Sequence, residues 1–165
     1  MPAVKSEQGS FEALFKAEYA RVAGIANRVL SDPQEAEDVA QEVFMDFHRL
    51  HPASSPYAAS WLYRAAAHTA LNRIRGRRRR QRREQANAPH EGSKAVDPQH
   101  EVEVNEDRRR VREALAKLPP KPAAVLVLRA SGLSYAEVAQ ALGVGTGQIG
   151  TLLRRAEAAL RKEVI

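Results

Sequence analysis

A run of arginines in the middle of the chain most restricts how this sequence can fold. Eight of the eleven residues from position 73 to position 83 are arginine. Guanidinium groups at this density cannot be buried together, so they need either a polyanion or bulk water. The run extends a stretch of helical apolar spacing, and stacking or hydrogen-bonding side chains precede it: Tyr63, Arg64, His68 and Asn72. A solvated tail is the ordinary interpretation of a charge run, but these neighbours favour contact with DNA.

A second nucleic-acid signal lies between Ser134 and Arg155, where the spacing is typical of a helix-turn-helix. Small Ala139 allows two helices to approach, Gly143 permits the turn, and Ile149 fills their shared core. A tight helical hairpin with no DNA contact could show the same spacing, and the expected recognition helix has no cation before Arg154. We interpret the segment as DNA-binding, so the chain is expected to contact DNA at two places.

Composition restricts the fold class and the compartment. Aromatic residues make up only 5% of the chain and there are nine prolines, which favours small helical units. A net charge of +6 agrees with a nucleic-acid partner. The absence of cysteine excludes disulfides and Cys-ligated zinc, and there is no apolar run of the roughly 20 residues that a membrane span needs. We expect a cytoplasmic protein that does not insert into a membrane.

Local signals predict an all-α chain with two helical modules. In the first, Ser10 is expected to cap a helix that ends near Leu30, Asp32-Pro33 to start a second helix, and residues 54–56 to start a third. Residues 84–106 show no periodicity and carry six acids against one lysine, which predicts a solvated linker. Further helices are expected at about 107–118, 120–130, 134–142 and 146–163. The inward apolar positions of the first module are expected to be Phe11, Leu14, Phe15, Val22, Ile25, Ala26, Val29, Leu30, Ala36, Val39, Ala40, Val43, Phe47, Leu50, Tyr57, Trp61, Leu62, Ala65, Ala66 and Ile74.

The second expected helix carries an outward acidic stripe of Glu35, Asp38, Glu42 and Asp46. These carboxylates are spread along one face and do not converge, so a metal or acid-base site is disfavoured. A solvated face is the default interpretation and a docking surface for a basic partner is the sharper one, with nothing in the stripe to decide between them. The histidine spacing supports no metal cluster, and we expect no cofactor.

Several motifs, taken in order, resemble the extracytoplasmic-function group of bacterial RNA polymerase sigma factors. They are Asp32-Pro33-Gln34-Glu35-Ala36-Glu37-Asp38-Val39-Ala40-Gln41-Glu42-Val43-Phe44, Trp61-Leu62-Tyr63-Arg64 with the basic run, Leu118-Pro119-Pro120, Gly132-Leu133-Ser134-Tyr135-Ala136-Glu137-Val138-Ala139, and Arg155-Ala156-Glu157-Ala158-Ala159-Leu160. The resemblance covers nearly everything from Ser10 to Lys162. It implies region 2 at residues 10–84, a linker at 85–104, and region 4 at 105–165.

The resemblance also implies partners and contact residues. Asp38, Gln41 and Glu42 would dock on the β′ coiled coil of core RNA polymerase, and region 4 would sit on the β flap. The minus-ten element of promoter DNA would be held by Trp61, Arg64, His68, Asn72, Arg75, Arg77, Arg78, Arg79 and Arg80. The minus-thirty-five element would be read by Thr146, Gln148, Gly150, Thr151, Arg154 and Arg155. An anti-sigma factor is expected as a further partner from the resemblance alone.

Some positions depart from the family pattern. His68 and Asn72 stand where Asn and Asp are usual, which bears on the choice of minus-ten bases. Gly150 and Leu152 occupy usually basic places, and Gly145 replaces a common Ser cap.

The first hypothesis is a non-catalytic initiation factor that binds core polymerase, selects promoters and opens the minus-ten element. The alternative is a sigma-like adaptor that binds polymerase or another sigma factor without reading the minus-thirty-five element independently. A helix-turn-helix repressor and a metal-dependent nuclease explain fewer of the features.

Overall fold

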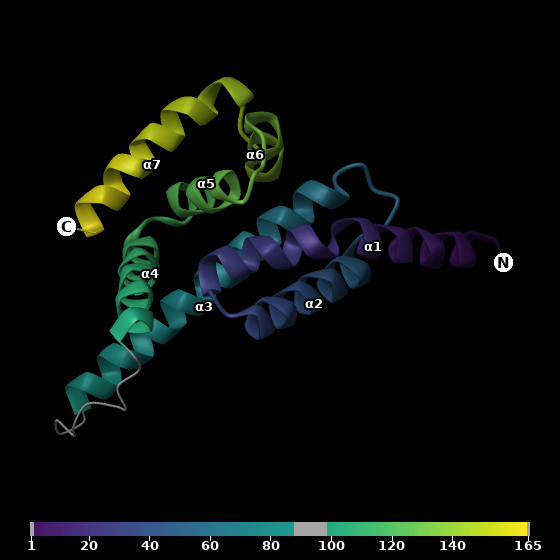
Figure 1. Cartoon of the computed structure of the whole chain (residues 1–165). Coiled ribbons are helices and arrows are strands. Elements are labelled where there is room, and N and C mark those ends of the chain that lie inside the picture. Colours follow the sequence, from purple (N-terminus) through teal and green to yellow (C-terminus); the bar gives the residue numbers. More distant parts are fainter. Residues whose placement is uncertain (1, 88–98, 165) are drawn as a thin grey trace.

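The computed structural model describes residues 2–87 and 99–164, and every regular element in these ranges is helical. The first module contains α1 (Pro2–Leu30), α2 (Pro33–Leu50) and α3 (Ala58–Asn87). The second contains α4 (Gln99–Lys117), α5 (Pro120–Ala130), α6 (Tyr135–Leu142), the 3-10 turn η1 (Thr146–Gln148) and α7 (Ile149–Val164). Figure 1 shows α1 to α3 lying alongside one another, with α4 to α7 on one side of them. The predicted all-α fold with two modules is confirmed.

The first module is a three-helix bundle whose second helix starts as predicted. The carboxylate of Asp32 accepts hydrogen bonds from the backbone N–H of Gln34 and Glu35 at 3.0 and 3.3 Å, and Pro33 occupies the first turn. Helix α2 packs against both α1 and α3, so it buries a wider stripe than one neighbour would require. Phe44, which the periodicity did not place inside, is therefore buried, and Leu50 in the last turn is 59% exposed.

Three other expectations about the first module were wrong. Ser10 is not an N-cap, because α1 begins at Pro2 and passes through it. Helix α3 begins at Ala58, after a turn in which the N–H of Ser55 bonds the carbonyl of Pro52, so residues 54–56 precede the helix. Phe15 and Tyr57 are exposed although both were expected to point inward.

The helices on both sides of the expected linker are longer than predicted. Helix α3 continues to Asn87, and α4 already begins at Gln99. These added turns, residues 84–87 and 99–106, consist largely of Glu, Gln and Ala, which favour helix without providing a hydrophobic period. The remainder of the predicted linker, residues 88–98, lies outside the described residues, and the predicted module boundaries at 84 and 105 remain a prediction.

The second module contains the predicted helix-turn-helix. Ser134 and Glu137 form a reciprocal capping box: the Glu137 N–H donates to Ser134 Oγ at 3.1 Å, and the Ser134 N–H donates to Glu137 Oε1 at 2.9 Å. Gly143 ends α6 in the left-handed region at φ 69°, which a residue with a side chain rarely adopts. Ala139 and Ile149 are buried between α6 and α7, as their spacing predicted.

The two modules are in direct contact. Helix α3 contacts α4, α5 and α6, and α1 contacts α5, so the second module lies against the helix that carries the arginine run (Figure 1). No helix in the described residues is long and apolar enough to cross a membrane.

Candidate nucleic-acid interface

The residues predicted to face DNA on α3 share one side of the helix, because Arg64, His68, Asn72 and Arg75 are three or four positions apart. Arg64 and Asn72 are exposed, whereas His68 and Arg75 are half-buried. Burial, together with the positive charges of Arg64 and Arg75, lowers the pKa of His68 below its usual value. Burial and the two neighbouring cations therefore favour the neutral form of the His68 imidazole.

The second module occupies part of that same side. The guanidinium of Arg75 donates a hydrogen bond to the carbonyl of Leu118, at the end of α4, over 2.9 Å. Burial and the neighbouring Arg79 lower the pKa of Arg75. Arg75 is thus bonded to protein in this arrangement, and it is available to DNA only when the two modules separate.

Trp61 lies in an aromatic corner at the start of α3. Its ring centroid is 5.3 Å from that of Phe47 and 5.4 Å from that of His51. The Nδ1 atom of His51 lies 2.9 Å from the Tyr57 hydroxyl, which ties the loop before α3 to the same corner. The indole is therefore held at a defined angle while remaining partly accessible.

Tyr63 has a different role from the one expected, since its side chain is only 4% exposed and cannot stack on DNA. Its hydroxyl donates to Glu18 at 2.5 Å and accepts from Arg21 at 3.3 Å. Burial first, and the hydrogen bond to Glu18 second, raise the pKa of Tyr63 to about 12. Tyr63 is a structural residue that joins α3 to α1.

The arginine run is divided between two sides of α3. Arg73 pairs with Glu42 at 3.2 Å and with Glu35 at 3.9 Å, and Arg77 also pairs with Glu35. Arg73 and Arg77 are four positions apart, so they lie on the same side of α3. Their ion pairs show that this side faces α2, and it is opposite the DNA-facing side. Arg78, Arg79 and Arg80 have no ion pair with any residue that the structure describes, so they remain available for phosphate.

The acidic stripe on α2 is correspondingly reduced. Glu35 and Glu42 bind arginines of α3, and Asp46 pairs with Arg49 on its own helix at 3.2 Å. Asp38 and Gln41 are exposed, and the Asp38 carboxylate has no ion pair with any residue whose side chain the structure describes.

An apolar side chain lies among the residues of this stripe. Met45 is 71% exposed and shares the face of Asp38 and Gln41, at positions i, i+3 and i+7. Met45 was not predicted as a site residue. The one sign of it in the sequence is an apolar residue on the polar side of the helix.

The expected minus-thirty-five residues form a second exposed face. Thr151, Arg154 and Arg155 lie on one side of α7 and are exposed, as is Thr146 in the preceding turn. Gly145 provides no side-chain cap, and the Oε1 atom of Gln148 accepts from the N–H of Gly145 at 3.3 Å, which is the other half of a capping box.

Two other positions in the recognition helix differ from the rest of this face. A Cβ on Gly150 would lie 3.9 Å from the Tyr135 ring, so Gly150 is close to α6. Leu152 is half-buried against the core.

Two arginines of α1 contact the second module, and neither was predicted as a site residue. Arg21 binds Glu137 through both nitrogens, at 2.8 and 3.3 Å, and Arg28 donates to the carbonyl of Ala130 at 2.8 Å. Glu137 also belongs to the capping box of α6, and its pKa is lowered by the Ser134 backbone hydrogen bond and then by Arg21. Because the partners are more than 100 residues apart, no local pattern could have indicated these contacts.

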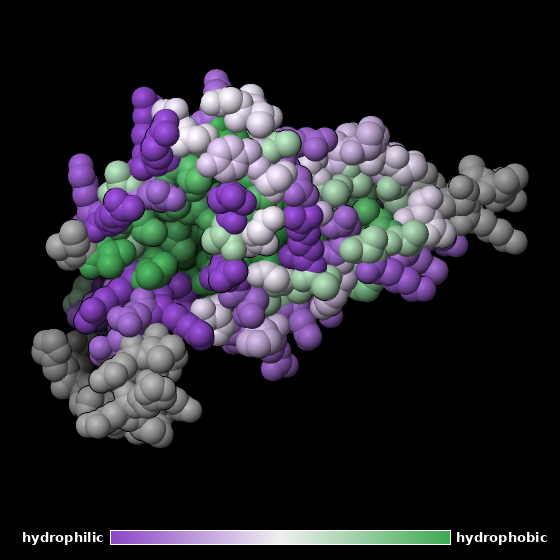
Figure 2. Space-filling model, turned by 45° about the horizontal axis from the view of Figure 1, so that its top comes forward, coloured by the Kyte–Doolittle hydropathy of each residue, from purple (hydrophilic) through white to green (hydrophobic). Residues whose placement is uncertain are grey.

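An apolar hollow lies on the second module. Figure 2 shows hydrophobic side chains gathered there within a rim of polar ones. Half-buried apolar residues of α4, α5 and α7 pack around the core of this module: Ala116, Leu126, Leu152, Ala159 and Leu160. An apolar hollow with a polar rim is typical of a surface that receives another protein.

Comparison with known proteins gives consistent matches across the whole chain. Residues 14–80 match the sigma-70 region 2 family, and residues 108–160 match the sigma-70 region 4 family. The ECF RNA polymerase sigma factor SigK of Mycolicibacterium vanbaalenii is 32% identical over 162 residues, which cover 93% of this chain and 81% of the relative. The RNA polymerase sigma-H factor of Pseudomonas aeruginosa is 29% identical, covering 96% of this chain and 88% of the relative. The structure of CnrH in complex with the cytosolic domain of CnrY matches with a TM-score of 0.57 and 23% identity, covering 98% of this chain and 91% of that one.

Proposed function

Because this chain belongs to the extracytoplasmic-function group of RNA polymerase sigma factors, we propose that its helices divide promoter selection into three separate contacts. The chain is a transcription initiation factor, and its contribution is binding without catalysis. The observation that carries the proposal is the separation of three exposed faces, on α2, α3 and α7, within regions that match sigma-70 regions 2 and 4 in order. The compartment that holds polymerase and DNA, the cytoplasm, is where this protein would act.

Helix α2 is the proposed contact for the β′ coiled coil of core polymerase. Asp38 and Gln41 supply polar contacts, and Met45 supplies an apolar one that adapts to its surroundings. Glu42 contributes less than the family resemblance implied, because Arg73 neutralises part of its charge. The contact is therefore mixed, with electrostatic steering from Asp38 and burial of Met45.

Helix α3 is the proposed minus-ten contact. Opening the DNA costs a few kcal/mol of unstacking per base step, and this cost is offset when extruded bases are held by protein. Arg64, His68 and Asn72 present hydrogen-bonding groups on one side, Arg79 continues this side, and Arg78 and Arg80 add phosphate-binding charge on the flanks of the helix. The two modules must separate for this contact, because Arg75 is bonded to Leu118.

Region 4 is the proposed contact for the minus-thirty-five element and for the β flap. Thr151, Arg154 and Arg155 form the exposed side of the recognition helix. The apolar hollow seen in Figure 2 provides a surface for apolar side chains of the flap.

An anti-sigma factor is the further partner that we propose. The support is the similar fold of CnrH, whose solved structure is a complex with the cytosolic domain of CnrY.

The decisive experiment is run-off transcription from genomic promoters with purified core polymerase and this chain. We expect specific transcripts from the two components alone. Asp38→Lys should abolish both co-purification with core polymerase and transcription, whereas Glu12→Lys, the same charge change at an exposed position of α1, should affect neither. Wild-type co-purification of Asp38→Lys in moderate salt would show that α2 is not the dock.

A second candidate is an adaptor that needs another sigma factor for minus-thirty-five recognition. The observation in its favour is the recognition helix, in which Gly150 and the half-buried Leu152 replace cations. Transcripts that appear only after a second sigma factor is added would support this candidate.

A further inference from the structure

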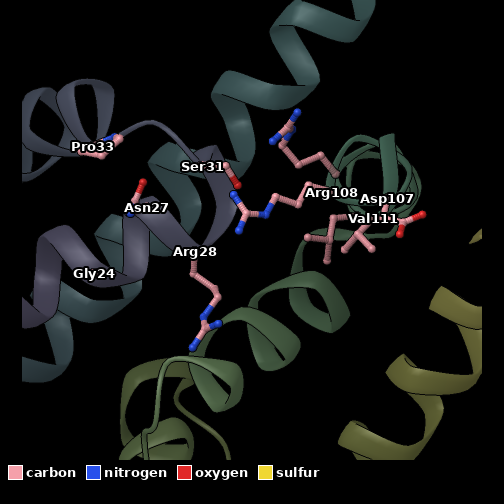
Figure 3. A pocket seen from close by; sticks show the side chains of 10 residues that line it. Gly24, Asn27, Arg28, Ser31, Pro33, Asp107, Arg108 and Val111 are labelled. Carbon is pink, nitrogen blue, oxygen red and sulfur yellow. The ribbon is translucent and has the colours of Figure 1, made fainter. Parts of the chain in front are cut away.

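A pocket of about 620 Å³ lies at the junction of the two modules, outside the three surfaces assigned above. Figure 3 shows side chains from the end of α1 on one side of it and side chains from α4 on the other. Its polar lining consists of Asn27, Arg28, Ser31, Asp107, Arg108 and Arg112. The pocket exists only while the modules are in contact, because α1 belongs to one module and α4 to the other.

Positive charge dominates this lining. Arg28, Arg108 and Arg112 bring three guanidinium groups to the lining, and Asp107 is the one acidic residue among the lining residues. None of these arginines has a carboxylate within ion-pair distance among residues 8–86 and 106–164, whose side chains the structure describes, and within these ranges Arg28 is bonded only to the carbonyl of Ala130. Arginines that are gathered without acids need another anion or open water.

The same positive charges act on the pKa of Arg112, whose guanidinium stays protonated. Burial lowers the pKa of Arg112, and the charges of Arg77, Arg108 and Arg109 lower it further, with only Glu113 acting in the opposite direction. The cluster of like charges therefore makes this a site of raised positive potential. An anion placed here would interact favourably with several cations at once.

Two uncharged residues of the lining have unusual local features. The Oδ1 atom of Asn27 is shielded from solvent and has no hydrogen-bond partner among the described residues, whereas more than about 90% of buried polar groups have one. Ser31 has a left-handed backbone at φ 52°, a conformation that is uncommon outside glycine and is often found at binding sites.

We propose that this pocket binds a small phosphorylated molecule, with its phosphates between Arg28, Arg108 and Arg112. Planar guanidinium groups match phosphate oxygens in pairs, and three of them suit a ligand with more than one negative charge. The volume is within the range of about 300–1,000 Å³ typical of small-molecule pockets. A recess between two helices fits such a molecule better than it fits a continuous duplex.

A ligand here contacts residues of both modules. It therefore favours the closed arrangement, in which Arg75 is bonded to Leu118. The site itself does not depend on how the chain binds polymerase, so a failure of either proposal leaves the other standing.

The test is isothermal titration of the full chain with ATP and with inorganic tripolyphosphate, at constant ionic strength and with sulfate as the reference anion. We expect both probes to bind at least tenfold more tightly than sulfate. The double substitution Arg108→Gln with Arg112→Gln should weaken both at least tenfold, and Asn27→Asp, which places a carboxylate of the same size in the pocket, should do the same. Tighter binding of ATP than of tripolyphosphate would identify a nucleoside phosphate, and equal binding of the two would identify an inorganic polyphosphate.

The matched control is Arg82→Gln with Arg83→Gln, which removes two exposed arginines of α3 outside the pocket. Binding should be unchanged in this variant, and circular dichroism should show native helix in all variants. An equal loss in the control and the pocket variants would overturn the proposal, because it would show non-specific binding to the arginine run. Sulfate binding as tight as ATP binding would also overturn it, as would displacement of ATP only by a single-stranded oligonucleotide.

Discussion

The ion pair between Arg21 and Glu137 allows the contact between the two modules to be tested directly. Arg21 binds both carboxylate oxygens, at 2.8 and 3.3 Å, and the two side chains are 36% and 38% exposed. Exposed ion pairs contribute about 0.2–1 kcal/mol, and bidentate geometry places this pair near the upper end. Arg21→Ala should therefore shift the equilibrium between closed and open modules by about 1 kcal/mol, which is about fivefold at low salt.

The choice of variant decides what is measured. Glu137→Ala would remove the ion pair and the capping box of α6 together, whereas Glu137→Gln keeps an acceptor for the Ser134 N–H. A double-mutant cycle of Arg21→Ala and Glu137→Gln isolates the coupling between the two side chains. Ser134→Ala is the matched control, because it removes the cap and leaves the ion pair in place.

The assay uses the absence of cysteine from the chain. Cysteines introduced at exposed Lys16 in α1 and Ala158 in α7 accept a fluorophore pair, and energy transfer reports whether the modules are closed. Arg21→Ala should lower the closed population in 50 mM salt, with less effect in 500 mM salt because screening weakens the pair. Binding of single-stranded minus-ten DNA should rise by a similar factor, since Arg75 is released. An unchanged closed population in 50 mM salt, or an effect independent of salt, would refute the assigned role of this contact.

Three further outcomes are expected. Replacing Arg78, Arg79 and Arg80 with Gln should lower the slope of log binding constant against log salt concentration for single-stranded DNA by up to about 2, at about 0.7 per phosphate contact. Arg77→Gln should change this slope less, because Arg77 is paired with Glu35. Equal changes per arginine would contradict this division. Because the folded pKa of His68 lies below its unfolded value near 6.5, the unfolded state binds more protons, so the free energy of unfolding should rise with pH up to about 6.5. His68→Gln should flatten this rise, and urea unfolding at pH 5.5 and 7.5 measures it; an unchanged slope would show that the His68 pKa is not lowered. Gly150→Ala should stabilise the chain by about 0.5 kcal/mol, since a Cβ there makes an ordinary contact with Tyr135; a lower melting temperature would show that this site needs glycine.

The sequence by itself determined the features encoded over short distances. The cap at Asp32, the capping box at Ser134 and the left-handed Gly143 each depend on residues within four positions, so their patterns were sufficient. Likewise, an arginine density that no core can accept required an exposed helix end. The helix ends at Asn87 and Gln99 were missed because good helix formers without an apolar face leave no periodic signal.

Only the tertiary structure decided which candidate side chains are available to a ligand. Tyr63 was expected at the DNA surface, but packing against α1 buries it beside Glu18 and Arg21. Arg73 and Arg77 were counted with the DNA-binding run, yet the crossing of α2 and α3 places them against Glu35 and Glu42. Contacts of this kind join residues 30 to more than 100 positions apart. They depend on the angle and register at which whole helices pack, which residue spacing along a single helix does not encode.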